Sequence, residues 1–295
     1  MTDLELEHLR QEKWRLSGKP VRTLEEARSF LESVGFCTLY PQKPALLAPT
    51  FFGAWIGADD RLPTWQHAFA DQRAKDATEL MVRLLRERDV YEANLFGENN
   101  PLLVAASVFP YFYALVGERN PKQSPKAGPR SEYSQLACDT FDLIRRKGPI
   151  SKQQMREDLG GSVSLPALDG ALVELWSRLR ITRVDYNAND GSSWDVLYRW
   201  SPDAVRDGMN LGVSEALTAL VSKYLGCVIA ADQAELDTFF GNFVPRSRVK
   251  EAVNALLAAR ELEFVRVGER TLVQIASAKT EVRSTPRTQR ARSTP

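Results

Sequence analysis

One pattern of apolar and polar positions occurs twice in the second half of the chain. In each copy, apolar residues spaced three and four apart predict an amphipathic helix, and two strand-like runs joined by a turn follow it directly. The first helix carries Leu165, Leu168, Leu172, Leu175, Trp176 and Leu179, and the second carries Val249, Ala252, Val253, Leu256 and Leu257. The expected strands cover 181–186 and 194–200 in the first copy, and 264–267 and 270–275 in the second. Aligning the two helix–strand junctions matches residues 179–184 with 262–267.

Two shorter helical patterns precede each copy. They cover 136–144 and 151–160 in the first copy, where Ser151 is placed as a cap, and 213–225 and 232–241 in the second. Three helices followed by a hairpin is the order of a winged helix, a helix-turn-helix variant whose third helix enters the major groove of DNA. We therefore predict winged-helix domains over residues 133–208 and 209–276.

The first 116 residues predict a third, α-rich and winged-helix-like domain. Residues 1–22 are polar and expected to be helical, with Trp14 as an anchor that docks this helix. Thr23 and Glu26 have the spacing of a capping box, and they precede an apolar helical stripe that ends at Gly35. The fold class is thus mainly α with small β-hairpins, an α+β protein of three tandem winged-helix domains.

Two segments lack the apolar residues needed for a core. Residues 117–132 contain three prolines and four basic residues, so we expect a linker or an extended loop. Residues 277–295 are rich in Ser, Thr, Arg and Pro, and we expect a disordered basic tail. The tail is either a nonspecific nucleic-acid arm or a solubilising extension, and its composition favours the second.

Composition excludes several classes of chemistry. The three cysteines, Cys37, Cys138 and Cys227, are scattered in apolar stretches, which predicts reduced buried thiols. There are only two histidines, and no P-loop or G-x-G-x-x-G spacing occurs, so we expect no metal site and no small-molecule cofactor. A chain of 295 residues that is 43% apolar has room for several small domains, and we expect a monomer.

No segment has the pattern of a membrane protein. The longest apolar stretch, 102–116, is interrupted by Pro110 and is shorter than the roughly 20 residues that a bilayer requires, so it predicts a core segment. The start of the chain lacks a basic residue run followed by an apolar stretch. We therefore expect a cytoplasmic protein without a membrane span.

Charge adds a candidate nucleic-acid surface. The net charge is only +1, so the position of the basic residues matters more than their number. The expected exposed side of the last helix carries Ser247, Glu251, Asn254, Ala255 and Ala258, flanked by Arg248 and Lys250 and with Arg246 at its start, and the hairpin adds Arg266 and Arg270. The candidates for DNA contact are Arg246, Arg248, Lys250, Asn254, Arg266 and Arg270. The cations suit phosphates, and Asn254 suits an adenine edge. Alternatively this is an ordinary solvated face, an interpretation that Glu251 among these residues favours.

The equivalent helix of the first copy has a different surface. Its expected outer face carries Gly170, Val173, Glu174 and Ser177, which is neither basic nor suited to reading bases. We expect this small, partly apolar face to pack against another domain.

Two sequence features carry a family resemblance. The phrase Lys147-Gly-Pro-Ile-Ser-Lys152 opens a second helix, and Leu-x-x-Leu-Trp-x-x-x-x-Ile spans Leu172 to Ile181. With the two helix–hairpin copies, they make most of residues 20–276 resemble the AlkZ/YcaQ-type DNA glycosylases. The resemblance implies a C-shaped molecule of tandem winged helices that holds duplex DNA with an alkylated or crosslinked base. It also implies a Gln-x-Gln or Gln-x-Asp motif that positions the water attacking the N-glycosidic bond.

The family's catalytic motif is replaced in this chain. The matching positions carry Thr38 and Tyr40. Water attack at an anomeric carbon calls for a carboxylate or an amide, and a phenol, with an ordinary pKa of about 10, is a poor base near neutral pH. Asp59 and Asp60 are the nearest substitutes in sequence. The sequence therefore predicts a protein that binds double-stranded DNA, is related to repair glycosylases and lacks their usual activity.

Two alternatives stay open. One is a DNA glycosylase that uses non-standard catalytic residues drawn from Thr38, Tyr40, Asp59 and Asp60, with Phe52 or Trp55 stacking on an extruded base. The other is a winged-helix scaffold that binds proteins, which the near-neutral charge permits. A positive concave channel would favour the two DNA-binding hypotheses over the scaffold.

Overall fold

One order of elements occurs three times in the chain. In the computed structural model, which describes residues 1–41, 46–58, 72–96, 101–187 and 190–276, each unit runs helix, short strand, helix, helix, strand, strand. Each unit closes with a three-stranded antiparallel sheet in which the last strand lies between the other two. The expected mixture of helices with small antiparallel sheets is confirmed.

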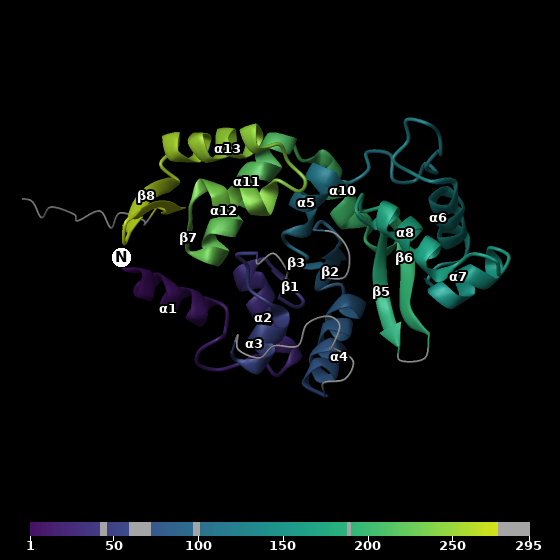
Figure 1. Cartoon of the computed structure of the whole chain (residues 1–295), viewed down its shortest axis with the longest axis horizontal. Helices are drawn as coiled ribbons and strands as arrows, with labels where there is room; N and C mark the ends of the chain where they lie inside the picture. The colour runs from purple at the N-terminus through teal and green to yellow at the C-terminus, as the bar shows by residue number, and fades with distance from the viewer. Residues whose placement is uncertain (42–45, 59–71, 97–100, 188–189, 277–295) are drawn as a thin grey trace, which may run out of the picture.

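The three units lie side by side along the long axis of the molecule (Figure 1). The N-terminal unit, in the centre of the view, comprises α2 (Leu24–Val34), β1 (Phe36–Thr38), α3 (Phe51–Ile56), α4 (Gln72–Glu87), β2 (Val90–Ala93) and β3 (Leu102–Ala105). The middle unit, on the right, comprises α6 (Gln135–Lys147), β4 (Ile150–Ser151), α7 (Lys152–Asp158), α8 (Leu165–Trp176), β5 (Ile181–Asn187) and β6 (Gly191–Val196). The C-terminal unit, on the left, comprises α11 (Val213–Val228), β7 (Ala230–Ala231), α12 (Gln233–Phe240), α13 (Arg246–Ala258), β8 (Leu262–Val267) and β9 (Arg270–Ile275).

In the described residues, four more helices lie outside these three units. They are α1 (Asp3–Lys13), α5 (Phe109–Val116), α9 (Leu197–Trp200) and α10 (Pro202–Asn210). The apolar segment 102–116 forms β3 and α5, and its side chains are largely buried, as predicted for a core segment. The predicted division between residues 208 and 209 falls inside α10. This helix packs closely on α5, because a Cβ at Gly208 would lie only 2.7 Å from the carbonyl oxygen of Pro110.

Local capping chemistry sets where several helices begin. Thr23 accepts a hydrogen bond from the backbone of Glu26, whose carboxylate in turn accepts from the Thr23 amide. Ser151 starts α7 and Asp232 starts α12 with the same reciprocal arrangement. These boxes satisfy amides that the first helical turn leaves without an internal partner. The predicted capping box at Thr23 and the predicted cap at Ser151 are confirmed.

A shared turn ends the third helix of each unit. Arg88, Leu179 and Arg260 adopt positive φ angles of 62°, 51° and 61°. In each case the next amide donates to a carbonyl five residues back, as at Arg180 and Leu175, which closes the helix with a Schellman-type turn.

This turn corrects the alignment of the two copies. Leu179 is equivalent to Arg260, and the strands begin two residues later, at Ile181 and Leu262. The alignment of residues 179–184 with 262–267 is therefore wrong by two residues. The predicted alignment matched residues with similar side chains. The structural equivalence depends instead on the position of the residue with positive φ that ends the helix.

Helix α1 docks on the C-terminal unit. The Trp14 indole N–H donates to the carbonyl of Cys227 at 2.9 Å, and the Arg10 guanidinium donates to the carbonyls of Val228 and Ala230 at 2.9 and 2.7 Å. Carbonyls at a helix C-terminus lack internal partners and attract positive charge, so α1 completes the end of α11. The docking role of Trp14 is confirmed, and the helix predicted over residues 1–22 is confirmed only as far as Lys13.

The three cysteines are buried and unbonded, in agreement with the prediction of reduced thiols. Within the described residues, no single helix has the length and apolar character to cross a membrane. The α10–α11 pair, which is bent by 110°, matches a membrane span in length and composition only.

A buried polar cluster joins the N-terminal and middle units. The carboxylate of Glu92 on β2 is 1% exposed and accepts from the guanidinium of Arg183 on β5 at 3.2 Å. That guanidinium lies over the rings of Trp176 and Trp194, 5.0 and 5.4 Å from their centroids. Burial raises the pKa of the Glu92 carboxyl, and Arg183 opposes that shift. The burial of Glu92 beside the half-buried Arg183 is therefore tolerated because each of the two charges compensates the other.

We expect Arg183→Ala to destabilise the protein by roughly 3 kcal/mol, because it leaves the Glu92 carboxylate buried and uncompensated. The estimate is at the low end for buried pairs, since Arg183 keeps 17% of its side-chain surface exposed. The measurement is urea unfolding at neutral pH. Arg178→Ala is the matched control, because Arg178 pairs with Glu132 on the surface and exposed pairs contribute about 1 kcal/mol or less.

The same variant has a defined pH dependence. Without Arg183, the pKa of Glu92 in the folded state rises further above its ordinary value of 4.5, so the folded protein keeps this proton at a pH where the unfolded chain loses it. The deficit of Arg183→Ala relative to the parent should therefore grow as the pH rises above about 4.5. A deficit that is equal at pH 4 and pH 7 would mean that Glu92 is not the group left uncompensated.

Candidate nucleic-acid interface

One face of α13 presents a row of polar side chains to solvent. Arg246, Lys250 and Asn254 follow one another at intervals of four residues and all three are exposed, so they share one helix face. The opposite face, with Val249, Val253 and others, is buried in the core. Among the described residues, neither Arg246 nor Lys250 has a carboxylate partner within ion-pair distance.

Arg248 lies beside this row and is also exposed. Its guanidinium is 3.2 Å from the carboxylate of Glu251, and both side chains are more than 60% exposed. Such a surface pair contributes little and is readily exchanged for a phosphate. The first turn of α13 has no side-chain cap, because the residue before it is Pro245.

The hairpin β8–β9 supplies the last two predicted contacts, and α1 covers its tip. Arg270 is 3.3 Å from the carboxylate of Asp3 and 3.7 Å from that of Glu235, so its charge is compensated within the protein. A Cβ at Gly268, in the turn of the hairpin, would lie 2.5 Å from Asp3. Arg266 is exposed, and within the described residues its side chain donates to the carbonyl of Gly268 at 3.4 Å and pairs with no carboxylate. Of the two hairpin residues, Arg266 is therefore the one available to a ligand.

The equivalent helix of the middle unit, α8, does not pack through the expected face. Gly170 is exposed, with open space where a Cβ would lie, and the carboxylate of Glu174 accepts from the backbone amide of Ser134 in its own unit. The contact with the N-terminal unit is made instead by Trp176, whose indole N–H donates to the carbonyl of Glu92 at 3.0 Å. This contact was not predicted from the sequence, because the prediction considered the outer face of the helix and Trp176 belongs to the apolar stripe.

Thr38 and Tyr40, which the sequence resemblance predicts to occupy the positions of the family motif, lie inside the N-terminal unit. Thr38 ends β1, pairs with Leu102 and donates its amide to the carbonyl of Pro49 at 3.0 Å. The Tyr40 ring packs on Phe52 with ring centroids 5.6 Å apart. Thr38 and Tyr40 are each only 2% exposed, so neither forms part of an open cleft.

The other proposed parts of a catalytic site are not brought to these two residues. Phe52 is fully buried and so cannot stack on an extruded base, which corrects that expectation. Trp55 is half-buried, with the guanidinium of Arg22 over its ring at 5.0 Å. Asp59 and Asp60 lie outside the described residues. Within the described part of the chain, no group of three His, Cys, Asp or Glu side chains has the arrangement of a metal site.

Comparison with known proteins identifies a family and a solved structure with a similar fold. A family profile described as "DNA glycosylase AlkZ-like" matches residues 55–292. The chain belongs to the AlkZ-like DNA glycosylase family. Among solved structures, the Streptomyces sahachiroi DNA glycosylase AlkZ is similar, with a TM-score of 0.58 and 12% identity over 93% of this chain and 70% of that one. At this identity the structural likeness concerns the fold alone. A search of curated proteins returns no match.

The family membership confirms the resemblance carried by the repeated units and the Leu172–Ile181 pattern. The matched range includes α13 and the hairpin β8–β9. It begins after Thr38 and Tyr40. The family profile thus covers the candidate DNA contacts and does not reach Thr38 and Tyr40, whereas the structural match to AlkZ covers 93% of the chain.

Proposed function

We propose that this protein binds duplex DNA through the C-terminal unit. The observation that carries the proposal is the exposed row Arg246, Lys250 and Asn254 on α13, whose two cations have no carboxylate partner among the described residues. Cations of this kind bind phosphates, and an exposed amide next to them suits the edge of a base. Membership of a family described as DNA glycosylases supports the choice of DNA over a protein partner.

We also infer that the three units are winged helices in tandem. The support is the shared order of helix, strand, helix, helix and hairpin, with the last strand central in each sheet. In this assignment α13 is the helix that enters a groove of the DNA, and Arg266 on the hairpin lies along the sugar-phosphate backbone of the DNA. The equivalent helices α4 and α8 expose no comparable row of unpaired cations with an amide among the described residues.

The proposed function does not include the usual chemistry of the family. Thr38 and Tyr40 offer a hydroxyl and a phenol where the resemblance calls for an amide or a carboxylate, and both are buried. We therefore propose a DNA-binding relative of repair glycosylases without their usual base-excision activity. The alternative, a glycosylase with other catalytic residues, is tested separately below.

The first test is a binding titration with a plain duplex at several salt concentrations. Four phosphate contacts, from Arg246, Arg248, Lys250 and Arg266, should give log K a slope of roughly −3.6 against log salt. Arg270 is left out because Asp3 and Glu235 already compensate its charge. Affinity that does not change with salt would contradict binding through these residues.

A pair of variants localises the contact. Arg246→Gln with Lys250→Gln should lower the salt slope by about 1.8 and weaken binding at 0.1 M salt by roughly tenfold to sixtyfold, for all sequences alike. The matched control is Lys75→Gln with Arg83→Gln, because these cations are exposed on α4, away from α13 (Figure 1). Equal losses in the two double variants would mean that total charge, and not α13, governs binding.

A further inference from the structure

The segment between α5 and α6 carries a second set of exposed cations. Lys122, Lys126 and Arg130 are exposed, and within the described residues none of them has a carboxylate partner. The two acidic residues of the segment are already engaged, Glu118 by Arg180 and Glu132 by Arg178. The segment therefore presents uncompensated positive charge to solvent.

This segment has no helix or strand, yet it is held in place by a buried arginine. The Arg180 side chain is 3% exposed, donates to Glu118 at 3.1 Å and also donates to the carbonyl of Gln123. Its guanidinium lies over the ring of Phe141, 4.5 Å from the centroid, and over that of Tyr133, at 5.6 Å. These contacts fix the backbone that carries the cations, so little conformational entropy is lost when they bind a ligand.

Further hydrogen bonds shape the segment around Lys126. The hydroxyl of Ser131 donates to the carbonyl of Lys126 at 2.6 Å and accepts from the amide of Tyr133 at 3.0 Å. On the other side, the hydroxyl of Ser124 donates to Asp142 on α6 at 2.7 Å. The segment, predicted to be a linker or an extended loop, is thus a loop that closes back on the middle unit.

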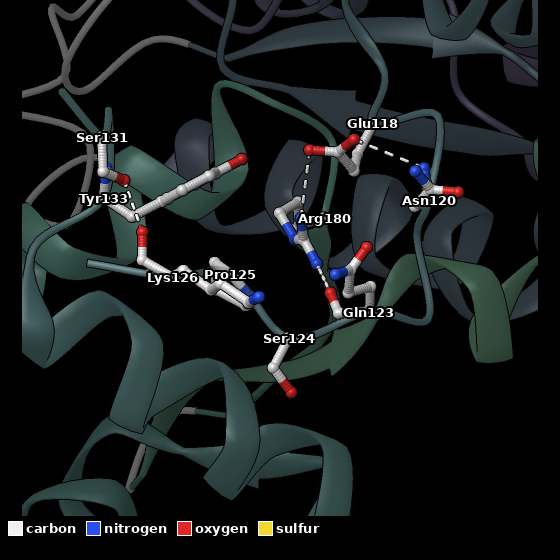
Figure 2. Close-up of a pocket in the computed structure, with 9 residues that line it drawn as sticks. All are labelled: Glu118, Asn120, Gln123, Ser124, Pro125, Lys126, Ser131, Tyr133 and Arg180. Atoms are coloured by element: carbon white, nitrogen blue, oxygen red, sulfur yellow. Dashed lines mark hydrogen bonds and ion pairs between the residues drawn. The ribbon is translucent and has the colours of Figure 1, made fainter. Parts of the chain in front are cut away.

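A polar pocket of about 240 Å³ lies beneath this loop (Figure 2). Lys126 and Arg180 line it together with the single carboxylate of Glu118, so its charged groups sum to a positive charge. Asn120, Gln123 and Tyr133 add side chains that can donate hydrogen bonds. The pocket therefore suits an anion with several acceptor oxygens, as a phosphodiester has.

The loop and α13 lie along the same long edge of the molecule, with α5 and α10 between them (Figure 1). We propose that Lys122, Lys126 and Arg130, with the pocket that Lys126 helps to line, bind the phosphate backbone of the same duplex that α13 contacts. This inference rests on the proposed function and extends the interface from the C-terminal unit to the middle unit. A duplex presents phosphates continuously along its axis, so one molecule of DNA meets both surfaces.

The test compares three proteins in the same titration with a plain duplex of about 24 base pairs. The loop variant replaces Lys122, Lys126 and Arg130 with Gln. The control variant replaces Arg73, Lys75 and Arg83 with Gln, which removes the same charge from exposed positions on α4, at the opposite edge in Figure 1. Thermal unfolding checks that both variants stay folded, which is expected because all six residues are exposed.

The four contacts of the C-terminal unit alone correspond to a slope of roughly −3.6, and three more contacts in the loop should steepen the slope of the parent to about −6.3. The loop variant should return the slope to about −3.6 and lose at least tenfold in affinity at 0.1 M salt, while the control variant should lose far less. If the loop variant binds as well as the control variant while Arg246→Gln with Lys250→Gln still weakens binding, this inference is overturned and the proposed function stands. If the parent protein does not bind the duplex at all, the proposed function itself fails.

Discussion

Under single-turnover conditions, we expect no detectable release of N7- or N3-alkylated purines from duplex DNA by this protein. Thr38 and Tyr40 occupy the positions at which the family resemblance puts the two water-positioning side chains, and each is only 2% exposed. Loss of a group that orients and activates the water typically costs a factor of 10² to 10⁴, so the rate should be at most about a hundredth of that of a true family enzyme. The measurement is the release of the base over time with enzyme in excess.

If the protein does release alkylated bases, three variants would identify the residue responsible. Robust excision that is abolished by Asp59→Asn or Asp60→Asn would assign the catalytic carboxylate to the segment after Gly57. Excision that survives both changes and is lost with Thr38→Ala would instead mean that a hydroxyl is sufficient to hold the water. Because excision and binding are measured separately, a protein that binds alkylated duplex without releasing the base agrees with the prediction.

Truncation of Trp176 to Ala should cost about 3 to 5 kcal/mol of unfolding free energy, as for other buried tryptophans. Its side chain is 6% exposed, packs edge-on against Trp194 with ring centroids 4.9 Å apart and donates its indole N–H to the carbonyl of Glu92. The change therefore removes core volume from the middle unit and a hydrogen bond between units. Urea unfolding of the variant and the parent measures the difference.

Trp200→Ala is the matched control, because Trp200 on α9 is only half-buried and holds Arg88 over its ring at 4.6 Å. It should cost clearly less than Trp176→Ala. Affinity for DNA should be unchanged in Trp176→Ala under conditions where the variant is folded. A Trp176→Ala protein as stable as the parent would contradict the assignment of this residue to the core.

Local features of the chain were predictable from the sequence. The capping residues Thr23 and Ser151 and the apolar stripe ending at Trp176 all act within a few residues, so their patterns can be read directly. The family resemblance rests on the same local patterns and is confirmed by the match over residues 55–292. The exposure of Asn254, with basic residues beside it, was also predictable, because helical periodicity separates the buried face of α13 from the exposed one.

Sheet topology was decided by the tertiary structure. The strands β4 and β7 are two residues long, too short for a pattern, and each pairs with the last strand of its unit. The turn that aligns the units depends on the left-handed residues Leu179 and Arg260, which share neither size nor polarity. Similar side chains therefore misled the alignment, while backbone geometry determined it.

The availability of the candidate site residues was likewise a tertiary property. Arg270 is compensated by Asp3, 267 residues away in sequence, because α1 docks beside the hairpin. Phe52 and Tyr40 are buried against each other, and the basic segment around Lys126 is held by Arg180. Periodicity tells which face of an element is apolar or charged. Which surface covers that face, and which opposite charge meets it, depends on contacts between segments far apart in the chain, and only the folded structure determines those contacts.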